Sequence, residues 1–421
     1  MNKEHLYNLL ISKFPYAPTE GQKTLLQKLS AFILQKDDRS MFVLKGYAGT
    51  GKTTVISTLV KTLPILNKNT ELLAPTGRAA KVLSAYSGKQ AFTIHKKIYM
   101  VSTGLDGALR FGLAYNPHKN TLFFVDEASM IPDNSVSEGF FPGADLLRDL
   151  MQYVHSGTNN KLILIGDTAQ LPPVGLDISP ALDLGYLRNT FSLSIHQDEL
   201  KEVVRQSLDS GILANATRIR NNLDTEGLEA LLHTDGFDDI ERITGEMLEE
   251  ELNHSFYGHE LGRSVVVTRS NKRANIFNRE IRNRILFREH EIATGDLLMV
   301  VKNNYFWVSQ DSKPGFIANG DIVEIVKILG YEELYGFRFA EVVVNMADYP
   351  DEPDLTVKVI LDSLASDGPS LSKQDNQTFF EEVMKDYEDE PHRRKRIEGV
   401  KNNPHFNALQ VKFAYALTCH K

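Results

Sequence analysis

A glycine-rich segment near the start of the chain has the residue types and spacing of a phosphate-binding loop. Residues 46–53 read Gly-Tyr-Ala-Gly-Thr-Gly-Lys-Thr, which matches the P-loop pattern at every fixed position. Its glycines let backbone N–H groups curl around phosphates, and the start of the following helix adds positive potential. We predict that Lys52 reaches the β- and γ-phosphates of ATP and that the Thr53 hydroxyl binds Mg²⁺. The loop residues predicted to bind the nucleotide are Gly46, Ala48, Gly49, Thr50, Gly51, Lys52, Thr53 and Thr54.

Two adjacent carboxylates follow the apolar run at residues 121–125. Asp126 is suited to hold Mg²⁺, and Glu127 is suited to orient or polarise the attacking water. An apolar run that ends in Asp-Glu is by itself equally typical of an ordinary strand end. The P-loop upstream is what favours the catalytic interpretation.

A third apolar run ends at Gly166-Asp167, and Gln170 follows it. Ligands of parallel sheets bind at the carboxyl ends of the strands, so a glutamine there can contact a γ-phosphate. The alternative is a loop that Pro172 and Pro173 terminate. Spacing alone leaves both interpretations open.

The spacing of apolar residues predicts the elements that position these side chains. In the first half of the chain, short buried strands alternate with helices, which is typical of an α/β layer fold with a parallel sheet. A strand before the P-loop and a helix after it are the context that a genuine P-loop requires, which disfavours a chance match. The predicted strands are residues 41–45, 71–74, 121–125, 161–165 and 264–268, and the predicted helices are residues 53–63, 77–85, 200–220 and 271–286.

The pattern of predicted secondary structure changes in the last third of the sequence. Residues 297–362 consist of β-rich runs separated by turn residues, which predicts a small barrel. Residues 363–403 are polar and charged, with a predicted helix at 373–386 and a basic run at 392–396 that we interpret as solvated charge. Residues 410–418 predict one more buried strand.

Composition narrows the class of protein. The 421 residues are 42% hydrophobic and 24% charged, as in a globular protein of two to four domains. The single cysteine, Cys419, excludes an internal disulfide framework and a cysteine-based zinc cluster. We find no secretory signal and no apolar run long enough to span a membrane. The net charge of −8 excludes coating of DNA by charge alone, but it leaves open enzymes that hold nucleic acid in a local groove.

Taken in order, several segments resemble the motifs of superfamily 1 helicases of the RecD/Dda type, which is superfamily 1B. The P-loop resembles motif I, and residues 74–81, Ala-Pro-Thr-Gly-Arg-Ala-Ala-Lys, are very similar to motif Ia. Residues 126–129 resemble motif II, and residues 166–173 resemble motif III. The resemblance covers nearly the whole chain. Shorter matches are Gly21-Gln22 to the adenine-contacting Q motif, Thr93-Ile94-His95 to motif Ib, residues 203–206 to motif IV and residues 268–271 to a segment that contacts nucleic acid.

The resemblance implies roles that the spacing alone does not reach. Gln22 would lie near adenine, and Arg205 and Gln170 would sense the γ-phosphate. Single-stranded DNA would lie across the tops of two motor domains that hold ATP between them. The implied nucleic-acid contacts are Pro75, Thr76, Arg78, His95, Arg269, Asn271, Thr418 and His420.

Simpler interpretations of several of these residues stay open. Arg78 is also compatible with a solvated helix face, and His95 with a core or turn histidine. Arg269 and Asn271 could equally cap the following helix. Trp307 and Phe306 fit the core of the barrel better than a surface on which bases stack.

The implied architecture is α/β, with two RecA-like P-loop motor domains whose parallel sheets are flanked by helices. A pin-like β-hairpin would be inserted near residues 98–119, with Asp106-Gly107 as its turn. An SH3-like β-barrel would be inserted in the second motor domain. The expected domains are residues 1–200 for motor domain 1A, 201–295 for the first part of domain 2A, 296–400 for the barrel insertion 2B with a charged helical segment, and 401–421 for an incomplete return to domain 2A.

The last residues, Thr418-Cys419-His420-Lys421, resemble the opening of motif V. In the family a Gln-Gly step follows, and motif VI then supplies a further arginine to the γ-phosphate. Such an arginine accelerates phosphoryl transfer by orders of magnitude. We therefore expect a chain truncated inside motif V, which binds nucleotide, hydrolyses it poorly and does not unwind DNA.

For the complete protein we expect an ATP-dependent DNA helicase or translocase. By resemblance it would use ATP and Mg²⁺, move 5′ to 3′ on single-stranded DNA and open junctions of single- and double-stranded DNA. We expect a cytoplasmic monomer of a bacterial or phage-infected cell, with replication or repair proteins as further partners. The alternative is a non-translocating DNA-dependent P-loop ATPase that acts as a switch or loader. A small-molecule P-loop kinase would explain neither motif Ia nor Arg205.

Overall fold

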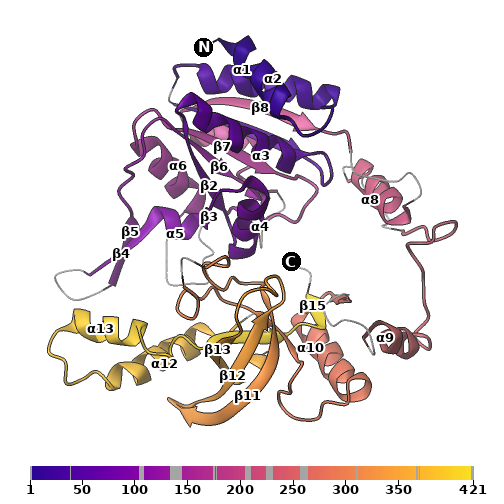
Figure 1. The fold of residues 1–421 in the computed structure, drawn as a ribbon, viewed down its shortest axis with the longest axis vertical. Coiled ribbons are helices and arrows are strands. Elements are labelled where there is room, and N and C mark those ends of the chain that lie inside the picture. The colour runs from indigo at the N-terminus through magenta and orange to yellow at the C-terminus, as the bar shows by residue number, and fades with distance from the viewer. Residues whose placement is uncertain are drawn as a thin grey trace.

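The structure is a computed structural model that contains an α/β unit, a closed β-barrel and smaller elements between them (Figure 1). The α/β unit and the barrel are the two large bodies of the molecule, and the chain passes from the first to the second through α8 and α9. The described residues are 2–37, 39–103, 109–132, 145–173, 176, 178–203, 210–223, 231–256, 264–309, 312–366, 368 and 370–418.

A six-stranded sheet in the order β3-β2-β6-β7-β1-β8 forms the centre of the α/β unit. Every neighbouring pair in it is parallel, so all six carboxyl ends lie along one edge. Strands β6 and β7 are buried at every position, as expected for a parallel sheet covered on both faces. The strands are β1 (Ser40–Gly46), β2 (Asn69–Ala74), β3 (Ala91–Thr93), β6 (Thr121–Val125), β7 (Lys161–Gly166) and β8 (Ser194–Leu200).

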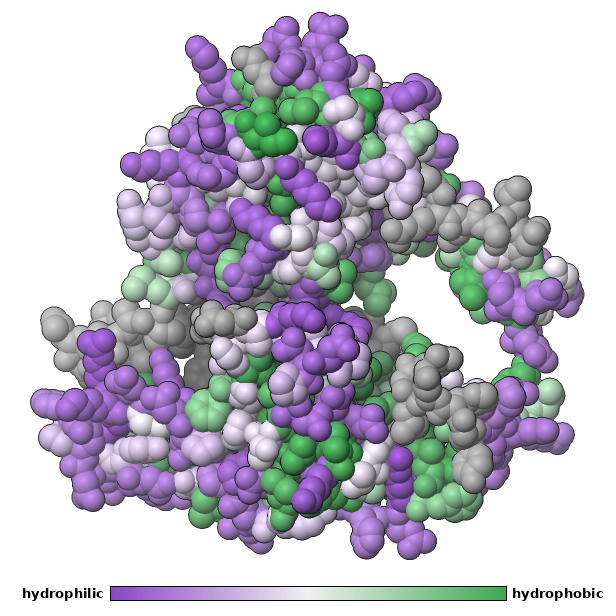
Figure 2. All heavy atoms as spheres, viewed as in Figure 1, coloured by the Kyte–Doolittle hydropathy of each residue, from purple (hydrophilic) through white to green (hydrophobic). Residues whose placement is uncertain are grey.

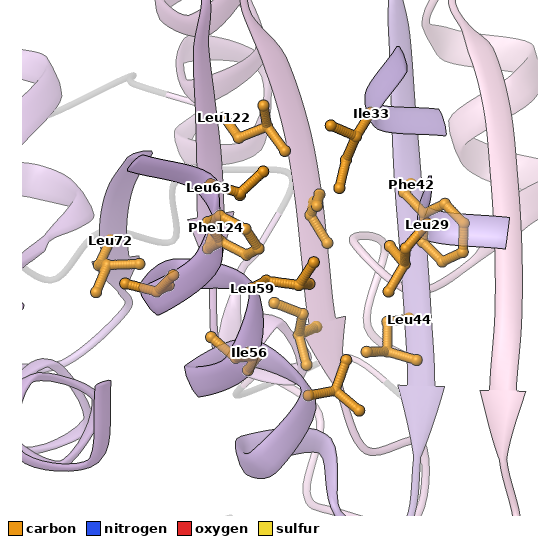
Figure 3. Packing of buried hydrophobic residues seen from close by; sticks show 14 of the residues in the cluster. Leu29, Ile33, Phe42, Leu44, Ile56, Leu59, Leu63, Leu72, Leu122 and Phe124 are labelled. Atoms are coloured by element: carbon orange, nitrogen blue, oxygen red, sulfur yellow. The ribbon is translucent and has the colours of Figure 1, made fainter. Parts of the chain in front are cut away.

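Helices cover both faces of this sheet. Alternate residues of a strand point to opposite faces, so Phe42 and Leu44 pack on one side and Met41 and Val43 on the other. Figure 3 shows the first side, where residues of the helix after the P-loop meet the sheet. The first face is covered by α1 (Lys3–Lys13), α2 (Glu20–Leu34), α3 (Lys52–Thr62) with its extension η1 (Leu63–Leu66), and α4 (Gly77–Ser87), and the second by α5 (Ile94–Ile98), α6 (Leu146–Ser156) and α7 (Leu184–Thr190).

A two-stranded antiparallel hairpin projects from the α/β unit at the place where the sequence predicts a pin. It consists of β4 (Tyr99–Thr103) and β5 (Leu109–Leu113), with Tyr99 opposite Leu113. The predicted turn at Asp106-Gly107 lies outside the described residues. The role of the hairpin as a pin stays a prediction.

The predicted small barrel is confirmed as a closed five-stranded barrel. Its interior is filled by aliphatic side chains such as Leu298, Val323 and Val342. The polar segment after β13 leaves the barrel as helices and packs through a separate aromatic cluster around Phe379. The barrel strands are β10 (Leu297–Val300), β11 (Ile322–Leu334), β12 (Phe337–Met346), β13 (Leu355–Ile360) and β14 (Leu409–Phe413), and the helices between β13 and β14 are α11 (Asp362–Ala365), α12 (Lys373–Lys385) and α13 (Arg393–Lys401).

Two predicted elements are wrong in their extent. The helix predicted at 200–220 begins only at Gly211, as α8 (Gly211–Asn221), because Leu200 ends the edge strand β8 that pairs with β1. The single strand predicted at 410–418 is two strands. Asn278 hydrogen-bonds the backbone of Phe413 and of Ala416 and turns the chain between them, so β14 closes the barrel. The following β15 (Ala416–Thr418) instead pairs in parallel with β9 (Val266–Thr268).

The region expected to form the second motor domain is represented by few elements. Among the residues that the structure describes, its sheet is the parallel pair β9–β15. Around this pair lie α9 (Leu248–Phe256), α10 (Asn271–Glu280) and a π-helical turn, η3 (Ile281–Ile285), that continues α10. The residues described between α8 and α9, 231–247, run along the side of the molecule beside an opening (Figure 2).

A buried ionic network ties this region to the barrel. Asp296, which is fully buried, accepts hydrogen bonds from Arg282 at 2.9 Å and from Arg288 at 2.9 Å. Tyr415, between β14 and β15, donates its hydroxyl to the same carboxylate at 3.1 Å. In the described part of the chain, none of the helices is long and apolar enough to cross a membrane.

Candidate active site and nucleic-acid interface

The P-loop has the backbone geometry that its glycines predict. Strand β1 ends at Gly46 and α3 begins at Lys52, and between them Gly49 and Gly51 have φ values of 79° and 88°. This left-handed region is accessible to glycine at little cost. A Cβ on Gly51 would also collide with the side-chain amide of Gln22. The turn therefore needs glycine for both its backbone angle and the space beside it.

Lys52 is held at the mouth of the loop. Its Nζ donates to the carbonyls of Gly46 at 2.6 Å and Tyr47 at 2.9 Å. Burial lowers the pKa of Lys52, and the nearby carboxylates of Asp167, Glu127 and Asp126 oppose that shift. One ammonium group therefore faces carboxylates that follow β6 and β7, which is the charge arrangement of a cation-assisted phosphate site.

The Asp126-Glu127 pair lies at the carboxyl end of β6, as predicted. Oδ1 of Asp126 accepts a hydrogen bond from the Glu127 backbone N–H at 3.0 Å. Glu127 has φ = 54°, a left-handed conformation that is unusual for a residue with a side chain. Such strained positions cluster at functional sites.

The environment of Glu127 makes it more basic than an ordinary glutamate. Burial raises its pKa, the negative charge of Asp126 adds to the rise, and Lys52 acts against it. A hydrogen bond from the Gln170 side chain also acts to lower the pKa. A carboxylate with a raised pKa accepts a proton near neutral pH more readily than an unperturbed one, which suits general-base catalysis.

The loop after β7 brings Gln170 to Glu127 and places a third carboxylate beside the site. Asp167 is buried and accepts a hydrogen bond from the Ala169 N–H at 2.8 Å, which fixes the turn that carries Gln170. The sequence places Asp167 in the segment that resembles motif III but assigns it no role. Its position directly after an apolar strand was the signal that could have identified it.

Gln22 lies against the P-loop backbone. Its side chain is 4% exposed, its Oε1 accepts from the Thr19 N–H at 3.0 Å, and its Nε2 donates to the Thr50 carbonyl at 3.1 Å. The first of these bonds belongs to a capping box at the start of α2. Gln22 thus connects the first turn of α2 to the P-loop, and its predicted contact with adenine stays a prediction.

Sequence reasoning missed two further residues at this site. The guanidinium of Arg220, at the end of α8, lies 4.4 Å from the centre of the Tyr47 ring, within range of a cation–π interaction. The hydroxyl of Tyr86, in the last turn of α4, donates to Oδ2 of Asp126. Neither residue belongs to a motif that we recognised. The aromatic side chain of Tyr47 at a variable P-loop position was the only hint of the first contact.

The residues of motif Ia contact the barrel. Thr76 caps α4 by accepting from the Ala79 N–H at 3.2 Å, and Pro75 precedes it, half-buried. Arg78 donates to the Gly320 carbonyl at 2.8 Å and lies 3.3 Å from a carboxylate oxygen of Asp348. Arg78 is nevertheless exposed, so a contact with DNA and a solvated helix face both stay predictions.

The same interface contains a buried ion pair and an aromatic cluster. Lys81 pairs with Asp321, whose side chain is 2% exposed. Beside them, Tyr305 and Phe316 stack with ring centres 4.9 Å apart, and Lys96 of α5 lies 4.5 Å from the Tyr305 ring. The loops before β11 therefore cover the amino ends of α4 and α5.

The remaining nucleic-acid candidates are scattered. His95 is exposed and its ring lies 5.8 Å from that of Tyr99. Arg269 is exposed, and Ser270 rather than Arg269 or Asn271 caps α10, so the capping interpretation of those two residues is wrong. Thr418 ends β15 opposite Thr268. Arg205 and His420 lie outside the described residues.

Of the two aromatic residues expected in the barrel core, Trp307 packs there, whereas Phe306 is exposed and its expected core position is wrong. Trp307 Nε1 donates to the Asn407 carbonyl at 2.7 Å, and the side chain packs against the barrel core. Phe306 packs edge-on against Trp307. These contacts fix Trp307 within the barrel.

The donor groups at the nucleotide site suit a magnesium ion. Mg²⁺ prefers oxygen ligands and is usually held by one or two protein groups together with the phosphates of its substrate. Thr53 and Asp126 supply a hydroxyl and a carboxylate, and both contact Tyr86. Among the described residues no group of three or more His, Cys, Asp or Glu side chains is arranged to hold a metal ion. A divalent cation here would therefore depend on the nucleotide for the rest of its ligands.

Comparison with known proteins agrees with the motifs. A family model described as an AAA domain matches residues 18–242, which is more than half of the chain. The ATP-dependent RecD2 DNA helicase of Deinococcus radiodurans is 30% identical over 199 residues, covering 47% of this chain and 24% of the relative. The ATP-dependent DNA helicase dda of Enterobacteria phage T4 is 26% identical over 322 residues, covering 73% of this chain and 67% of the relative.

Among solved structures, a Pif1 helicase from Bacteroides in complex with ADP-AlF3 and single-stranded DNA aligns with 80% of this chain and 74% of its own. The two sequences are 17% identical in the alignment, and the TM-score is 0.45. The chain spans about a quarter of the RecD2 relative and about two thirds of the Dda relative. The chain belongs to the AAA-domain family whose model it matches, and it is similar to the RecD2 and Dda DNA helicases.

Proposed function

We propose that this chain is the motor of an ATP-dependent DNA helicase or translocase. The observation that carries the proposal is the convergence of Lys52, Asp126, Glu127 and Gln170 at the carboxyl ends of β1, β6 and β7. The relatives named as ATP-dependent DNA helicases support the same activity. By resemblance we further propose movement from 5′ to 3′ and opening of junctions between single- and double-stranded DNA.

In the proposed chemistry, positively charged and N–H groups bind the phosphates, and oxygen-bearing side chains hold the cation. Lys52 and the N–H groups of the P-loop bind the β- and γ-phosphates, and Thr53 and Asp126 hold the cation. When bound, Mg²⁺ neutralises charge on the phosphates. Glu127 accepts a proton from the attacking water. Gln170 keeps Glu127 oriented through the hydrogen bond between their side chains.

We propose that the loss of the γ-phosphate is coupled to the grip on DNA through the loops at these strand ends. Gln170 and Arg205 would sense the phosphate, and Gln22 would lie near the adenine. The DNA would contact Pro75, Thr76, Arg78, His95, Arg269, Asn271, Thr418 and His420. The domains would be residues 1–200, 201–295, 296–400 and 401–421, as the sequence predicts, with β14 of the last segment completing the barrel.

Nucleotide-dependent affinity for single-stranded DNA tests this proposal independently of the hydrolysis rate. We would measure the fluorescence anisotropy of a labelled oligo(dT) with a non-hydrolysable ATP analogue, with ADP and without nucleotide. A motor must bind DNA differently in these states, and linkage requires DNA to change nucleotide affinity by the same factor. We expect a change of at least fivefold, which is about 1 kcal/mol of coupling. Lys52→Ala should abolish it.

The outcomes separate the candidate functions. An affinity for oligo(dT) that does not depend on nucleotide would contradict the proposal. In the complete protein, nucleotide-dependent DNA binding without strand displacement on a forked substrate would favour the non-translocating switch or loader. An ATP hydrolysis assay with and without oligo(dT) would show in the same preparation whether hydrolysis responds to DNA.

A further inference from the structure

Tyr86 contacts both residues that are expected to hold the divalent cation. Its side chain comes from the last turn of α4 and reaches the carboxyl end of β6, where its hydroxyl donates to Oδ2 of Asp126. The Thr53 side chain hydrogen-bonds the same hydroxyl. No motif assigns Tyr86, and neither its spacing nor its helix marks it as a site residue.

The backbone around Tyr86 holds the side chain in this position. The Ser57 hydroxyl of α3 donates to the Tyr86 carbonyl at 2.9 Å, so the two helices are joined at this residue. The ring packs against the buried core beside α3. The second oxygen of Asp126 is occupied by the Glu127 N–H at 3.0 Å. The orientation of the carboxylate is therefore fixed from both sides.

The direction of these hydrogen bonds matters for metal binding. A hydroxyl has one proton and two lone pairs. To bind a cation through its oxygen, Thr53 must give its proton to another acceptor. The Tyr86 hydroxyl donates a hydrogen bond to Asp126, so its oxygen can accept a hydrogen bond from the Thr53 hydroxyl. The order Thr53 to Tyr86 to Asp126 leaves lone pairs on Thr53 and on the carboxylate for a cation or its water ligands.

We propose that Tyr86 is a positioning residue for the divalent cation of the nucleotide site, and this inference rests on the proposed function. The Tyr86 hydroxyl accepts a hydrogen bond from Thr53 and donates one to Asp126. These two hydrogen bonds orient both side chains toward one cation. Partners that orient metal ligands in this way contribute strongly to metal affinity. A purely structural tyrosine would affect stability and leave the cation dependence unchanged.

The test is the Mg²⁺ dependence of nucleotide binding, which needs no turnover. We would titrate Tyr86→Phe and the unaltered chain with fluorescent mant-ADP in EDTA and at increasing Mg²⁺. With EDTA the two affinities should agree within about twofold, because the phosphate-binding loop is unchanged. The Mg²⁺ concentration for half-maximal gain in affinity should rise about tenfold in Tyr86→Phe. Mn²⁺ titrations would test whether the effect holds for a second oxygen-preferring cation.

Tyr99→Phe is the matched control. Tyr99 donates to Oδ2 of Asp149 at 2.6 Å in the same α/β unit, and in this control a tyrosine–aspartate bond is lost away from the P-loop. It should leave the Mg²⁺ titration unchanged. Thermal unfolding of both variants would establish that they are folded, and Tyr86→Leu would replace Tyr86→Phe if the latter is not.

Three results would contradict the proposal. An unchanged Mg²⁺ midpoint in Tyr86→Phe would show that the hydroxyl does not position the cation. An equal loss of affinity in EDTA and in Mg²⁺ would show a general effect on the pocket. If the unaltered chain binds no mant-ADP under either condition, the proposed function fails and the role of Tyr86 fails with it.

Discussion

The nucleotide site and the surface expected to bind nucleic acid are built in opposite ways. At the nucleotide site, Lys52, Asp126 and Gln170 follow strands of one sheet and meet at its carboxyl edge. On the expected nucleic-acid surface, Arg78 and its neighbour Lys81 contact barrel residues more than two hundred positions away. A sheet edge therefore gathers residues that local motifs identify, whereas the second surface depends on how two bodies of the molecule meet.

The largest expected effect is at the nucleotide site. Glu127→Gln removes the proposed general base, and we expect the ATP hydrolysis rate to fall by about 10² to 10⁴-fold. Nucleotide affinity should stay close to that of the unaltered chain, because Lys52 and the P-loop are intact. Mant-ATP binding and phosphate release would be measured side by side. A variant that no longer binds nucleotide would show that the role assigned to Glu127 is wrong.

The same variant should be more stable at neutral pH. Glu127 has a raised pKa in the folded state, so its stabilising contribution is complete below its unfolded pKa and is lost as the pH rises through the folded pKa. Above that pH the charged carboxylate is buried beside Asp126. Replacing it with an amide removes this cost, and the Tm at pH 8 should increase while the Tm at pH 4 changes less.

The third prediction tests whether Arg78 contacts DNA or acts through its contact with the barrel. Arg78→Gln should weaken oligo(dT) binding about fivefold and reduce the dependence of affinity on salt, because one phosphate contact is lost. Asp348→Asn removes only the exposed ion pair to the barrel and leaves the charge of Arg78 available. We expect this variant to bind oligo(dT) at least as tightly as the unaltered chain. Equal losses in both variants would mean that Arg78 acts through the barrel contact.

The smallest effect concerns the hydrogen bond between Gln170 and Glu127. Because this bond lowers the pKa of Glu127, its removal in Gln170→Ala should raise that pKa further. The base works only when deprotonated, so the acid limb of the pH profile of kcat/KM should move to higher pH. Gln152→Ala, on the exposed face of α6, is the control. If the acid limb does not move, Gln170 does not influence the pKa of Glu127.

These two regions also show what the sequence could predict. Phosphate-binding glycines, the Asp126-Glu127 pair and the strands that position them follow from local rules of backbone angle and apolar spacing. A small barrel was predicted from the β-rich runs of residues 297–362, but its fifth strand, β14, comes from a segment that was assigned to the second motor domain. The site residues supplied by α4 and α8, Tyr86 and Arg220, were not predicted, because their contacts depend on how helices pack and no local pattern records that.

The division of the last strand was missed for a related reason. Residues 410–418 are mostly apolar and contain neither glycine nor proline, so nothing within the segment indicates a turn. The turn is imposed by Asn278, which is distant in the sequence and satisfies the backbone on both sides of the break. The contact between motif Ia and the barrel also joins residues that are distant in the sequence. A Cβ on Gly77 would lie 2.7 Å from the Cβ of Ala318.

The break between β14 and β15 has a mechanical consequence. Only Ala414 and Tyr415 separate a barrel strand from a strand of the β9 pair, and Tyr415 is anchored to the buried Asp296. A connection this short and this well anchored has little torsional freedom. Any rotation of the β9–β15 pair must therefore rotate the barrel with it. The loop that contacts α4 lies beside this connection, since Ile322 and Tyr415 pack in one cluster, so a rotation would also shift that contact.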